Sequence, residues 1–568
     1  MIAMMPDLGL PPGLVMILAA IAIPFLPPLT RHIWMLLAVA ISATTLLASP
    51  GDHLIWSIMG LELSLYHVDN LTFPFSMIFH IAAFLVVIYS WHVKTWPELT
   101  ATLAYAGAAI AAVHAGDLIS LFIWWEATAI TSVFIILAAG TVAARQAAMR
   151  YLIIQVSSGV LLIGGAALYY FEFGRITFEA MTLEGMASWF IFLAFGIKAA
   201  FPFLNGWLQD AYPEATPTGT VALSAFTTKL AIYALARGFP GTEALIWIGA
   251  VMTAFPVFFA VIENDLRRVL SFSLNNQLGF MVVAVGIGTP LALNGAVAHA
   301  FVHIIYKALL FMSVGCVVHQ TGTAKASELG GLYRKMPFTM LCCVIGAMSI
   351  AAFPLFSGFV AKSLTMTALG GTEYALAYLV LLFASAGVLE HSGIKIPYFT
   401  FFAHPSTREI GKTPAGMTIA MGIAAIMCIG IGIFPGLLYQ ILPYAKVKNP
   451  YDLSHVTGQL QLLLLAGMAF VVLIRLGLYP PEIRSTVLNT DWFYRRLAPA
   501  IIKPLVAFFM SLAKSADHII MMVARKAMAG AKWIAEHPVA GPVIPGPAAL
   551  VQVMVLLFIM AIIYANLI

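Results

Sequence analysis

Two stretches decide the fold that we expect: FGIKAAFPFLNGW (residues 195–207) and AAFPLFSGFVAKSL (residues 351–364). Each contains the tetrad AAFP, at Ala199–Pro202 and Ala351–Pro354, within a long apolar run. Proline removes a helical hydrogen bond, which membrane helices tolerate where protein or water binds the freed carbonyl group. Interrupted helices at corresponding places in two halves of a chain are typical of an inverted repeat with a mid-membrane ion path. We therefore predict two broken helices.

The composition indicates the class of protein. Of the 568 residues, 61% are hydrophobic and only 9% are charged, and the mean hydropathy is +0.96. Soluble globular proteins carry about 25% charged residues, so this chain is expected to be surrounded mainly by lipid. The formal net charge of +5 is small for this length and does not indicate a nucleic-acid partner. We predict an all-α, polytopic membrane protein of about sixteen transmembrane helices.

Sixteen apolar runs are separated by short connections that often contain proline or glycine. These predicted spans lie near residues 9–28, 32–49, 70–92, 99–115, 117–139, 147–171, 186–205, 216–237, 243–262, 269–288, 292–320, 336–368, 371–403, 415–443, 457–478 and 547–567. The seventh and the twelfth spans contain the two tetrads, and the span that follows each of them bears a lysine, Lys229 or Lys395. This agreement in order indicates two five-helix repeats of opposite orientation.

The chain is expected to have six parts. They are N-terminal helices (1–98), a first repeat (99–240), a second repeat (241–405), C-terminal helices (406–478), an amphipathic segment (479–545) and a final helix (546–568). The segment 479–545 is interpreted as too polar to span the membrane. Its basic residues alternate with apolar clusters, as in a helix that lies laterally in the membrane interface, and Pro504 is expected to kink it. The alternative is a solvated linker.

Lysine and arginine residues in the connections predict the orientation. Connections after odd-numbered spans hold Arg31, Lys94, Arg145, Arg150, Arg267, Arg268, Lys325, Arg334, Lys335, Arg408 and Lys412. Those after even-numbered spans hold Arg175, Arg237, Lys446 and Lys448. We therefore expect the odd connections to be cytoplasmic and both termini to be extracytoplasmic, in a bacterial inner membrane. No basic residue precedes Arg31, so the first helix is expected to remain as an anchor.

Titratable residues within the apolar runs are the candidate functional groups, because an ionisable group at membrane depth is costly unless it is paired or hydrated. Glu126 lies in LISLFIWWEATAITSVFIIL, and Lys198 precedes the first tetrad. A lysine near Glu126 would restore the charge of the carboxylate, so the two are expected to form a proton-holding pair. The alternative is a static buried salt bridge.

Three further lysines lie in later spans. Lys229 occurs in SAFTTKLAIYALAR, where Thr227 and Thr228 could hold water. It is interpreted as a reversible proton carrier, or alternatively as a lysine that snorkels to the interface. Lys362, near the end of the twelfth span, is expected to be the terminal carrier. Lys395 fits a relay and an interfacial anchor equally well.

The stretch AVAHAFVHIIYKALLFM carries His299, His303 and Lys307 at helical spacing. Residues four apart lie on one helix face, so imidazoles and a lysine in this order could form a hydrated proton wire. A metal site made from two histidines is the weaker interpretation, because no cysteine or carboxylate is close in sequence. The histidines His80 and His114 are interpreted as packing or capping residues.

No cofactor and no catalytic or redox site are predicted. The four cysteines, Cys316, Cys342, Cys343 and Cys428, lie in apolar runs without metal-ligand spacing and are expected to pack in the core. No phosphate-binding loop or nucleophile motif occurs in the sequence. Driving energy must therefore come from partner proteins or from an ion gradient.

Five stretches resemble a known family. FIWWEA, GIKAAFPFLNGWLQDAYPEATP, SAFTTKLAIYALAR, HAFVHIIYKALLF and FPLFSGFVAKS are similar to the antiporter-like subunits of respiratory complex I and of multisubunit Mrp-type sodium/proton antiporters, and above all to the D-type subunit of the latter. They occur within residues 65–370. The resemblance implies an inverted five-helix repeat and partner membrane subunits. It also implies a proton relay, whose positions here would be Glu126, Lys198, Lys229, Lys307 and Lys362, with assistance from His299 and His303.

Four positions depart from the family pattern, one of them being Pro202, which is displaced by one residue. Asn205 stands where a histidine is common, Gln209 replaces a common proline, and Gln277 stands where some members carry histidine. Asn205 and Gln277 are therefore further candidate site residues. The amphipathic segment resembles the lateral helix of the distal complex I subunit, and ordinary D-type antiporter subunits lack it.

The expected function is translocation of H⁺, with Na⁺ as a further candidate ion, by one subunit of a membrane assembly. A subunit that energises a complex I-like oxidoreductase or a bicarbonate-uptake system is the alternative. A non-conducting membrane scaffold is weaker, and a monomeric solute carrier is weaker still, because no polar substrate pocket is recognisable.

Overall fold

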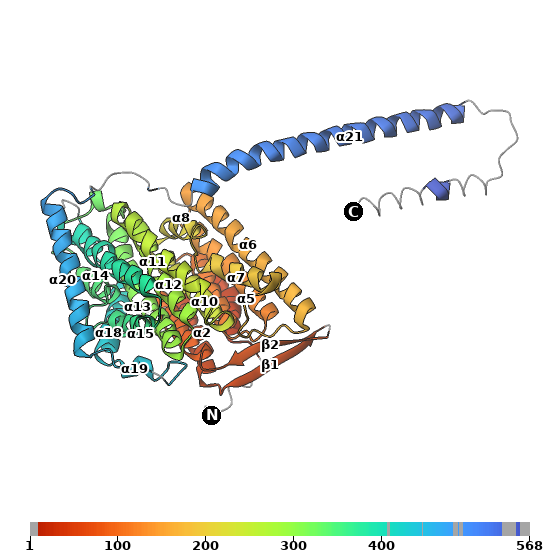
Figure 1. Cartoon of the computed structure of the whole chain (residues 1–568). Helices are drawn as coiled ribbons and strands as arrows, with labels where there is room; N and C mark the ends of the chain where they lie inside the picture. Colours follow the sequence, from red (N-terminus) through yellow and green to blue (C-terminus); the bar gives the residue numbers. More distant parts are fainter. Residues whose placement is uncertain are drawn as a thin grey trace. The chain divides into compact units, whose positions relative to one another are not determined.

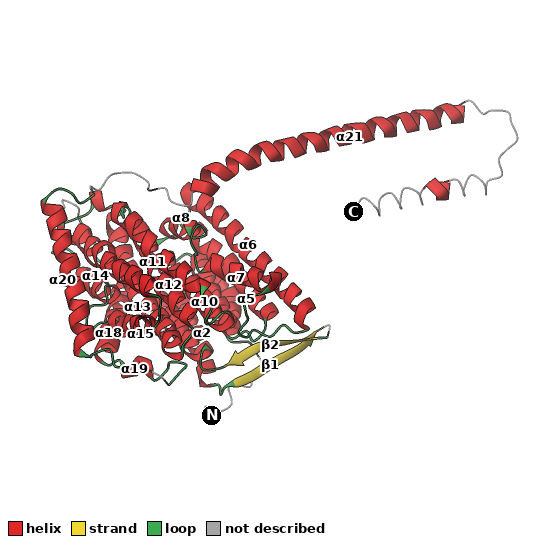
Figure 2. Cartoon of the chain, in the orientation of Figure 1, coloured by secondary structure: helices red, strands yellow, loops and turns green. Residues whose placement is uncertain are grey.

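A computed structural model of the chain describes residues 10–58, 60–405, 409–445, 447–480, 487, 492–536 and 553–556. It divides into two compact units, 1–491 and 492–568, which are considered separately. Helices make up nearly all of the first unit (Figures 1 and 2). Among the described residues, twelve helices are long and apolar enough to cross a membrane, and Leu14–Phe25, Gly185–Lys198 and Pro337–Ile350 are shorter apolar helices. The predicted all-α membrane fold is confirmed, whereas the number of sixteen spans is not.

Each predicted span from 9–28 to 457–478 coincides with one helix or with a group of shorter helices. The helices of the first half are α1 (Leu14–Ala22), α2 (Pro28–Ala43), α3 (Thr72–Tyr89), α4 (Trp96–Val113), α5 (Leu118–Leu137), α6 (Val142–Phe173), α7 (Gly185–Lys198), α8 (Gly206–Ala211), α9 (Pro217–Ala225) and α10 (Thr227–Gly238). Short 3₁₀ turns at Ile23–Phe25, Thr44–Leu47 and Tyr212–Glu214 extend or join them.

The second half follows the same order. Its helices are α11 (Ala244–Ile262), α12 (Leu266–Ile287), α13 (Pro290–Thr321), α14 (Pro337–Ile350), α15 (Ser357–Gly370), α16 (Ala375–Val388), α17 (Lys395–Pro397), α18 (Ala415–Ile433), α19 (Gly436–Tyr439) and α20 (Leu453–Arg475). Two π-helical turns, η7 (Leu389–Ile394) and η8 (Tyr398–Phe402), flank α17, and a 3₁₀ turn lies at Ala326–Glu328.

Corresponding helices of the two halves have matching ends. Asp117 caps α5 and Asp265 caps α12, and each carboxylate accepts hydrogen bonds from two amides of the first helical turn. The next helices, α6 and α13, are both 32 residues long. They end at Gly174 (φ 67°) and Gly322 (φ 76°), both in the left-handed region that glycine adopts without strain. The equivalent helices lie five predicted spans apart, as expected for two repeats of opposite orientation.

The two AAFP tetrads form the same backbone turn. Ala200 (φ 61°) and Ala352 (φ 57°) are left-handed, as are the residues after each proline, Phe203 (φ 68°) and Leu355 (φ 73°). These are the non-glycine residues with positive φ in the described part of the chain. A left-handed residue other than glycine costs roughly 1–2 kcal/mol, so both turns are held in place by the surrounding structure. The prediction of a broken helix at each tetrad is confirmed.

Polar side chains bind carbonyl groups near these breaks. Trp207 Nε1 donates to the carbonyl oxygen of Ile197 at 3.0 Å, and Gln459 Nε2 donates to that of Ala351 at 3.1 Å. A backbone carbonyl without a partner would be costly inside a membrane. The breaks are therefore built features of the protein interior.

A β-hairpin between α2 and α3 was not predicted. Strands β1 (Gly51–Ile58) and β2 (Leu61–Val68) pair antiparallel (Figure 2). The sequence LELSLYHV of β2 alternates with a period of two, and Leu63 and Leu65 are buried. This signal was present in the sequence but lies between much stronger apolar runs.

An ionic network fastens the hairpin to α10. His67 Nδ1 lies 3.0 Å from Asp52 Oδ1 on β1, its Nε2 lies 3.6 Å from Asp69 Oδ2, and Arg237 of α10 binds the same Asp69 oxygen at 2.7 Å. Hydrogen bonding to Asp69 is the largest of the effects that raise the pKa of His67 above its ordinary value of 6.5. The network thus gives the hairpin a pH-dependent attachment.

The hairpin should loosen as the pH rises. Because the folded pKa of His67 is raised, its stabilising contribution is complete below about pH 6.5 and is lost as the pH rises through the folded value. We expect amide hydrogen exchange in residues 51–68, corrected for the intrinsic rate, to become faster from about pH 6.5 upward. His67→Gln should abolish this pH dependence. An equally steep dependence in that variant would contradict the assignment.

The second unit contains α21 (Ala498–Glu536), which follows a π-helical turn at Phe493–Leu497. The helix continues through Pro504 without interruption. By length and composition, Arg495–Gly530 qualifies as a membrane span, so the expectation that this segment is too polar to span is wrong on that measure. The predicted final span lies outside the described residues except for 553–556, as do Arg408 and Lys446.

Candidate functional site

Lys198 is completely buried at the end of α7 and points to α5. Its ammonium Nζ donates to the carbonyl oxygen of Trp125 at 2.5 Å and to Thr128 Oγ1 at 2.9 Å, and it lies 4.3 Å from the centre of the Trp125 ring. Because the helix breaks after Ala199, α7 ends inside the protein, where Lys198 can reach α5. Lys198 therefore lies at the inner face of the helix that carries Glu126.

Glu126 is half-buried, and no direct ion pair joins its carboxylate to Lys198. The two charges are nevertheless close enough to interact electrostatically. The reason is the helix geometry: Trp125 and Thr128 face Lys198, whereas Glu126 faces α6. Its carboxylate packs against Gly159, and its buried Oε1 has no hydrogen-bond partner in the described protein.

A methyl group at Gly159 should move the Glu126 carboxylate. A Cβ atom there would lie 1.8 Å from Glu126 Oε1, whereas at Gly164, on the same helix, the nearest atom would be 3.6 Å away in Phe190. Since Glu126 has a flexible end, the helix should tolerate Gly159→Ala. We expect proton flux in membrane vesicles to fall about tenfold or more, because small displacements of reacting groups are costly.

Gly164→Ala is the matched control, with expected normal flux and equal or slightly higher thermal stability, because alanine favours the helix. Equal flux in the two variants would show that the position of the Glu126 carboxylate is unimportant.

Lys229 owes its position to a break that the sequence did not predict. The predicted span 216–237 is divided at Phe226 into α9 and α10. The amide of Thr227 donates to Tyr105 Oη at 3.0 Å, and Lys229 Nζ donates to the carbonyl oxygen of Ser224 at 2.5 Å. The lysine is completely buried, which excludes the snorkelling alternative.

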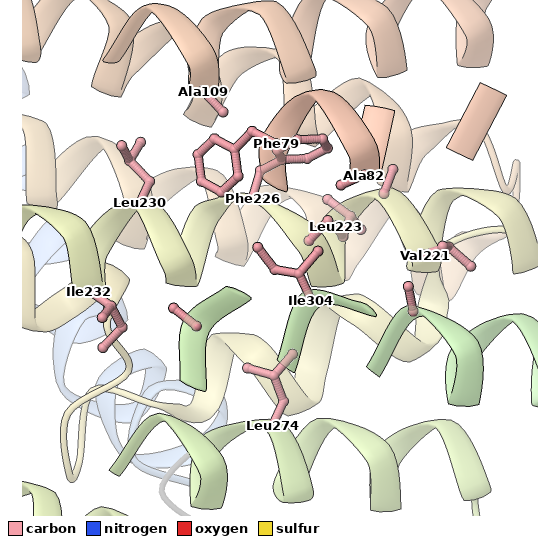
Figure 3. Packing of buried hydrophobic residues seen from close by; sticks show 14 of the residues in the cluster. Phe79, Ala82, Ala109, Val221, Leu223, Phe226, Leu230, Ile232, Leu274 and Ile304 are labelled. Atoms are coloured by element: carbon pink, nitrogen blue, oxygen red, sulfur yellow. The ribbon is translucent and has the colours of Figure 1, made fainter. Parts of the chain in front are cut away.

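Aromatic packing stabilises this break. The ring of Phe226 lies 5.3 Å from that of Phe79 and 5.2 Å from that of Tyr105, in edge-to-face geometry. Figure 3 shows Phe226 next to Phe79, with Leu223 of the same segment nearby. Aromatic and hydrophobic packing around Phe226 thus stabilises the interruption between α9 and α10.

The predicted cluster on α13 is buried as a unit. His299 Nε2 lies 3.1 Å from Gln277 Oε1 of α12 and 3.1 Å from Tyr306 Oη, and the rings of His299 and His303 are 6.2 Å apart. Neither ring nitrogen of His303 has a hydrogen-bond partner in the described protein, and Lys307 Nζ has none either. The helical spacing therefore brings the predicted groups together.

This cluster also interacts electrostatically with the lysines of α10 and α15. The charge of Lys229 acts on His299, His303 and Lys307, and the charge of Lys362 acts on His299. Groups coupled in this way titrate as a set rather than one by one. A change of charge at one lysine is therefore felt at the next.

Lys362 and Lys395 have different environments. Lys362 Nζ donates to Ser385 Oγ of α16 at 3.1 Å and lies 4.5 Å from the centre of the Phe280 ring. The hydroxyl groups of Ser357 and Ser363, on the same helix as Lys362, bond to Ser349 and to the carbonyl oxygen of Val360. Lys395 Nζ donates at 2.6–3.1 Å to three carbonyl oxygens at the end of α11, in the manner of a helix cap. This geometry favours the anchor interpretation of Lys395.

Neutral polar residues complete the site. Asn205 Nδ2 donates to Gln209 Oε1 at 3.2 Å, and Gln277, besides contacting His299, donates to Asn276. Gln155 of α6 was missed: it is completely buried, and neither side-chain atom has a hydrogen-bond partner in the described protein. An amide side chain within the apolar run LIIQVSS is the signal that could have identified it.

The sequence of the chain is similar to those of known membrane proteins. Residues 115–390 match the family model described as NADH:quinone oxidoreductase/Mrp antiporter, transmembrane. The sequence is 29% identical over 432 residues to Na⁺/H⁺ antiporter subunit A1 of Staphylococcus aureus, covering 67% of this chain and 53% of that protein. The chain thus spans about half the length of the curated relatives that it matches.

Two solved structures share the fold. The Mrp complex from Dietzia sp. DQ12-45-1b contains a chain with a TM-score of 0.67 and 20% identity, and the match covers 81% of this chain and all of that one. Respiratory complex I from Thermus thermophilus gives a TM-score of 0.63 and 21% identity over 75% of this chain and 98% of that one. The resemblance predicted from the sequence is confirmed.

Proposed function

We propose that this chain is a proton-translocating subunit of a multisubunit membrane assembly, and the match of residues 115–390 to the family model described as NADH:quinone oxidoreductase/Mrp antiporter supports this proposal. Protons would move between its buried lysines and histidines, driven by an opposing cation gradient. Na⁺ is the first cation to test, since a relative is named as a Na⁺/H⁺ antiporter subunit.

The observation that carries the proposal is a series of buried polar atoms without protein partners. In the described residues they include atoms from α5 to η7: Glu126 Oε1, both side-chain atoms of Gln155, Gln209 Nε2, Thr228 Oγ1, Asn275 Oδ1, both nitrogens of His303, Lys307 Nζ, Thr365 Oγ1 and His391 Nε2. Buried polar groups nearly always have partners, and water supplies them where protein does not. If the protein were only a structural scaffold, apolar residues at these positions would make it more stable.

The proposed route joins the buried titratable groups in the order of their electrostatic interactions. A proton would be shared by Glu126 and Lys198, pass to Lys229 at the break in the eighth span, and continue through His303, Lys307 and His299 to Lys362. Asn205 and Gln277 would hold water or orient their neighbours. Each protonation changes the electrostatic potential at the next group, which gives the transfer its order.

Further expectations belong to this proposal. The repeats would comprise residues 99–240 and 241–405, in a bacterial inner membrane with both termini outside the cytoplasm, and other membrane subunits would be the partners. A second candidate is an energising subunit of a complex I-like oxidoreductase, which the shared fold with respiratory complex I supports.

Purification of the native assembly, followed by reconstitution into liposomes containing a pH-sensitive dye, tests the function. We expect proton efflux on addition of external Na⁺ or K⁺. Proton movement that needs an electron donor and acceptor would favour the second candidate. The absence of proton movement under both conditions would contradict the proposal.

A further inference from the structure

His391 is a buried histidine outside the proposed route. It is fully shielded from solvent within the π-helical turn η7, between α16 and α17. Such turns are rare, and they occur frequently at functional sites because they re-aim side chains within a helix. The position of His391 therefore requires an explanation beyond packing.

One ring nitrogen of His391 has a polar partner, and the other has none in the described protein. Nδ1 lies 2.9 Å from Ser392 Oγ, and Ser392 Oγ donates to Ser273 Oγ of α12 at 2.7 Å. Since the Ser392 hydroxyl proton is directed at Ser273, the ring donates from Nδ1. Nε2 is then an unprotonated acceptor, and it has no hydrogen-bond partner in the described protein.

The serine pair connects His391 to the histidine cluster of α13. Ser273 and Gln277 are four residues apart on α12, so their side chains lie on one face of the helix, one turn apart. Gln277 Oε1 is in contact with His299 and Tyr306. Polar groups thus extend from His299 along α12 to His391.

Charged groups surround His391. The charges of Lys307, Lys362 and Lys395 all act on the ring. Lys395 is held at the end of α11, beside Glu263, whose carboxylate pairs with Arg268 at 3.2 Å. His391 therefore lies between the buried lysines and a charged end of the transmembrane helices.

We propose that His391 is a further proton carrier, which joins the central histidines and lysines to the membrane surface at the end of α11. The inference deepens the proposed function and rests on it. A proton accepted at Nε2 is balanced by release of the Nδ1 proton to Ser392 Oγ, and the Ser392 hydroxyl proton moves to Ser273 Oγ. Ser273 in turn releases its own hydroxyl proton to a water molecule on the Gln277 side of α12, so no group keeps an extra proton. The reverse sequence carries a proton the other way.

His80 offers a matched control. It is also a buried histidine, but both of its nitrogens have protein partners, Ser42 Oγ at 2.9 Å and the carbonyl oxygen of Ser76 at 2.8 Å. In membrane vesicles that contain the complete assembly, we expect His391→Gln to lower proton flux at least tenfold and Ser273→Ala to lower it severalfold. His80→Gln should keep at least half of the flux after correction for protein amount.

The inference is overturned if His391→Gln and His80→Gln conduct equally well while Lys198→Ala abolishes flux. If Lys198→Ala conducts normally and His391→Gln does not, the proposed route fails but the role of His391 stands. If His391→Gln does not accumulate, Ser273→Ala decides: normal flux in that variant overturns the inference, and reduced flux with intact assembly supports it.

Discussion

Replacement of Lys198 by alanine is expected to reduce proton translocation by roughly a hundredfold or more, the scale at which a positioned proton donor or acceptor contributes. The variant removes the ammonium that contacts α5 at Trp125 and Thr128 and that interacts electrostatically with Glu126. The Trp125 carbonyl and the Thr128 hydroxyl remain part of the α5 helix when the ammonium is removed. We therefore expect the variant subunit to assemble normally. Quenching of a pH-sensitive dye in everted vesicles, with subunit content measured by immunoblotting, checks both points.

Lys325→Ala is the control for this experiment. Lys325 is an exposed connection lysine, 4.0 Å from Glu328, and its loss should leave the flux unchanged. Glu126→Gln should resemble Lys198→Ala, because it removes the other member of the electrostatic pair. Normal flux in Lys198→Ala vesicles would contradict the proposed function.

Replacement of Lys307 by methionine is expected to have opposite effects on transport and stability. Lys307 Nζ is completely buried without a hydrogen-bond partner in the described protein, so its charge disfavours the fold. Well-packed apolar replacements of buried charges are commonly neutral or stabilising by about 1–4 kcal/mol. We therefore expect an unchanged or higher thermal midpoint in detergent, together with loss of proton flux.

Lys395→Met supplies the contrast. Its ammonium donates to three carbonyl oxygens, which would lose their partner, so we expect the thermal midpoint to fall. A fall of similar size for Lys307→Met would show that Lys307 stabilises the structure through contacts of its own. Unchanged flux in Lys307→Met would remove this residue from the proposed route.

Much of the candidate site could be predicted from the sequence, because an ionisable residue in an apolar run is rare enough to be conspicuous. Lys198, Lys229, Lys307 and Lys362 were selected on that ground, and all four are buried. Gln155 is uncharged and therefore less conspicuous in its apolar run. His391 lies in the polar stretch LEHSGIK (residues 389–395), where a histidine does not stand out, and both residues were missed.

The membrane class, most helix positions and the breaks at the two AAFP tetrads follow from the order of the amino acids, because hydropathy and proline act locally along the chain. Which side chains touch one another depends on helix packing. Lys198 binds α5 through Trp125 and Thr128 rather than through Glu126, and Tyr105 receives the amide freed beside Phe226. Such contacts depend on how helices rotate and pack against one another, and a residue's own segment does not encode that rotation.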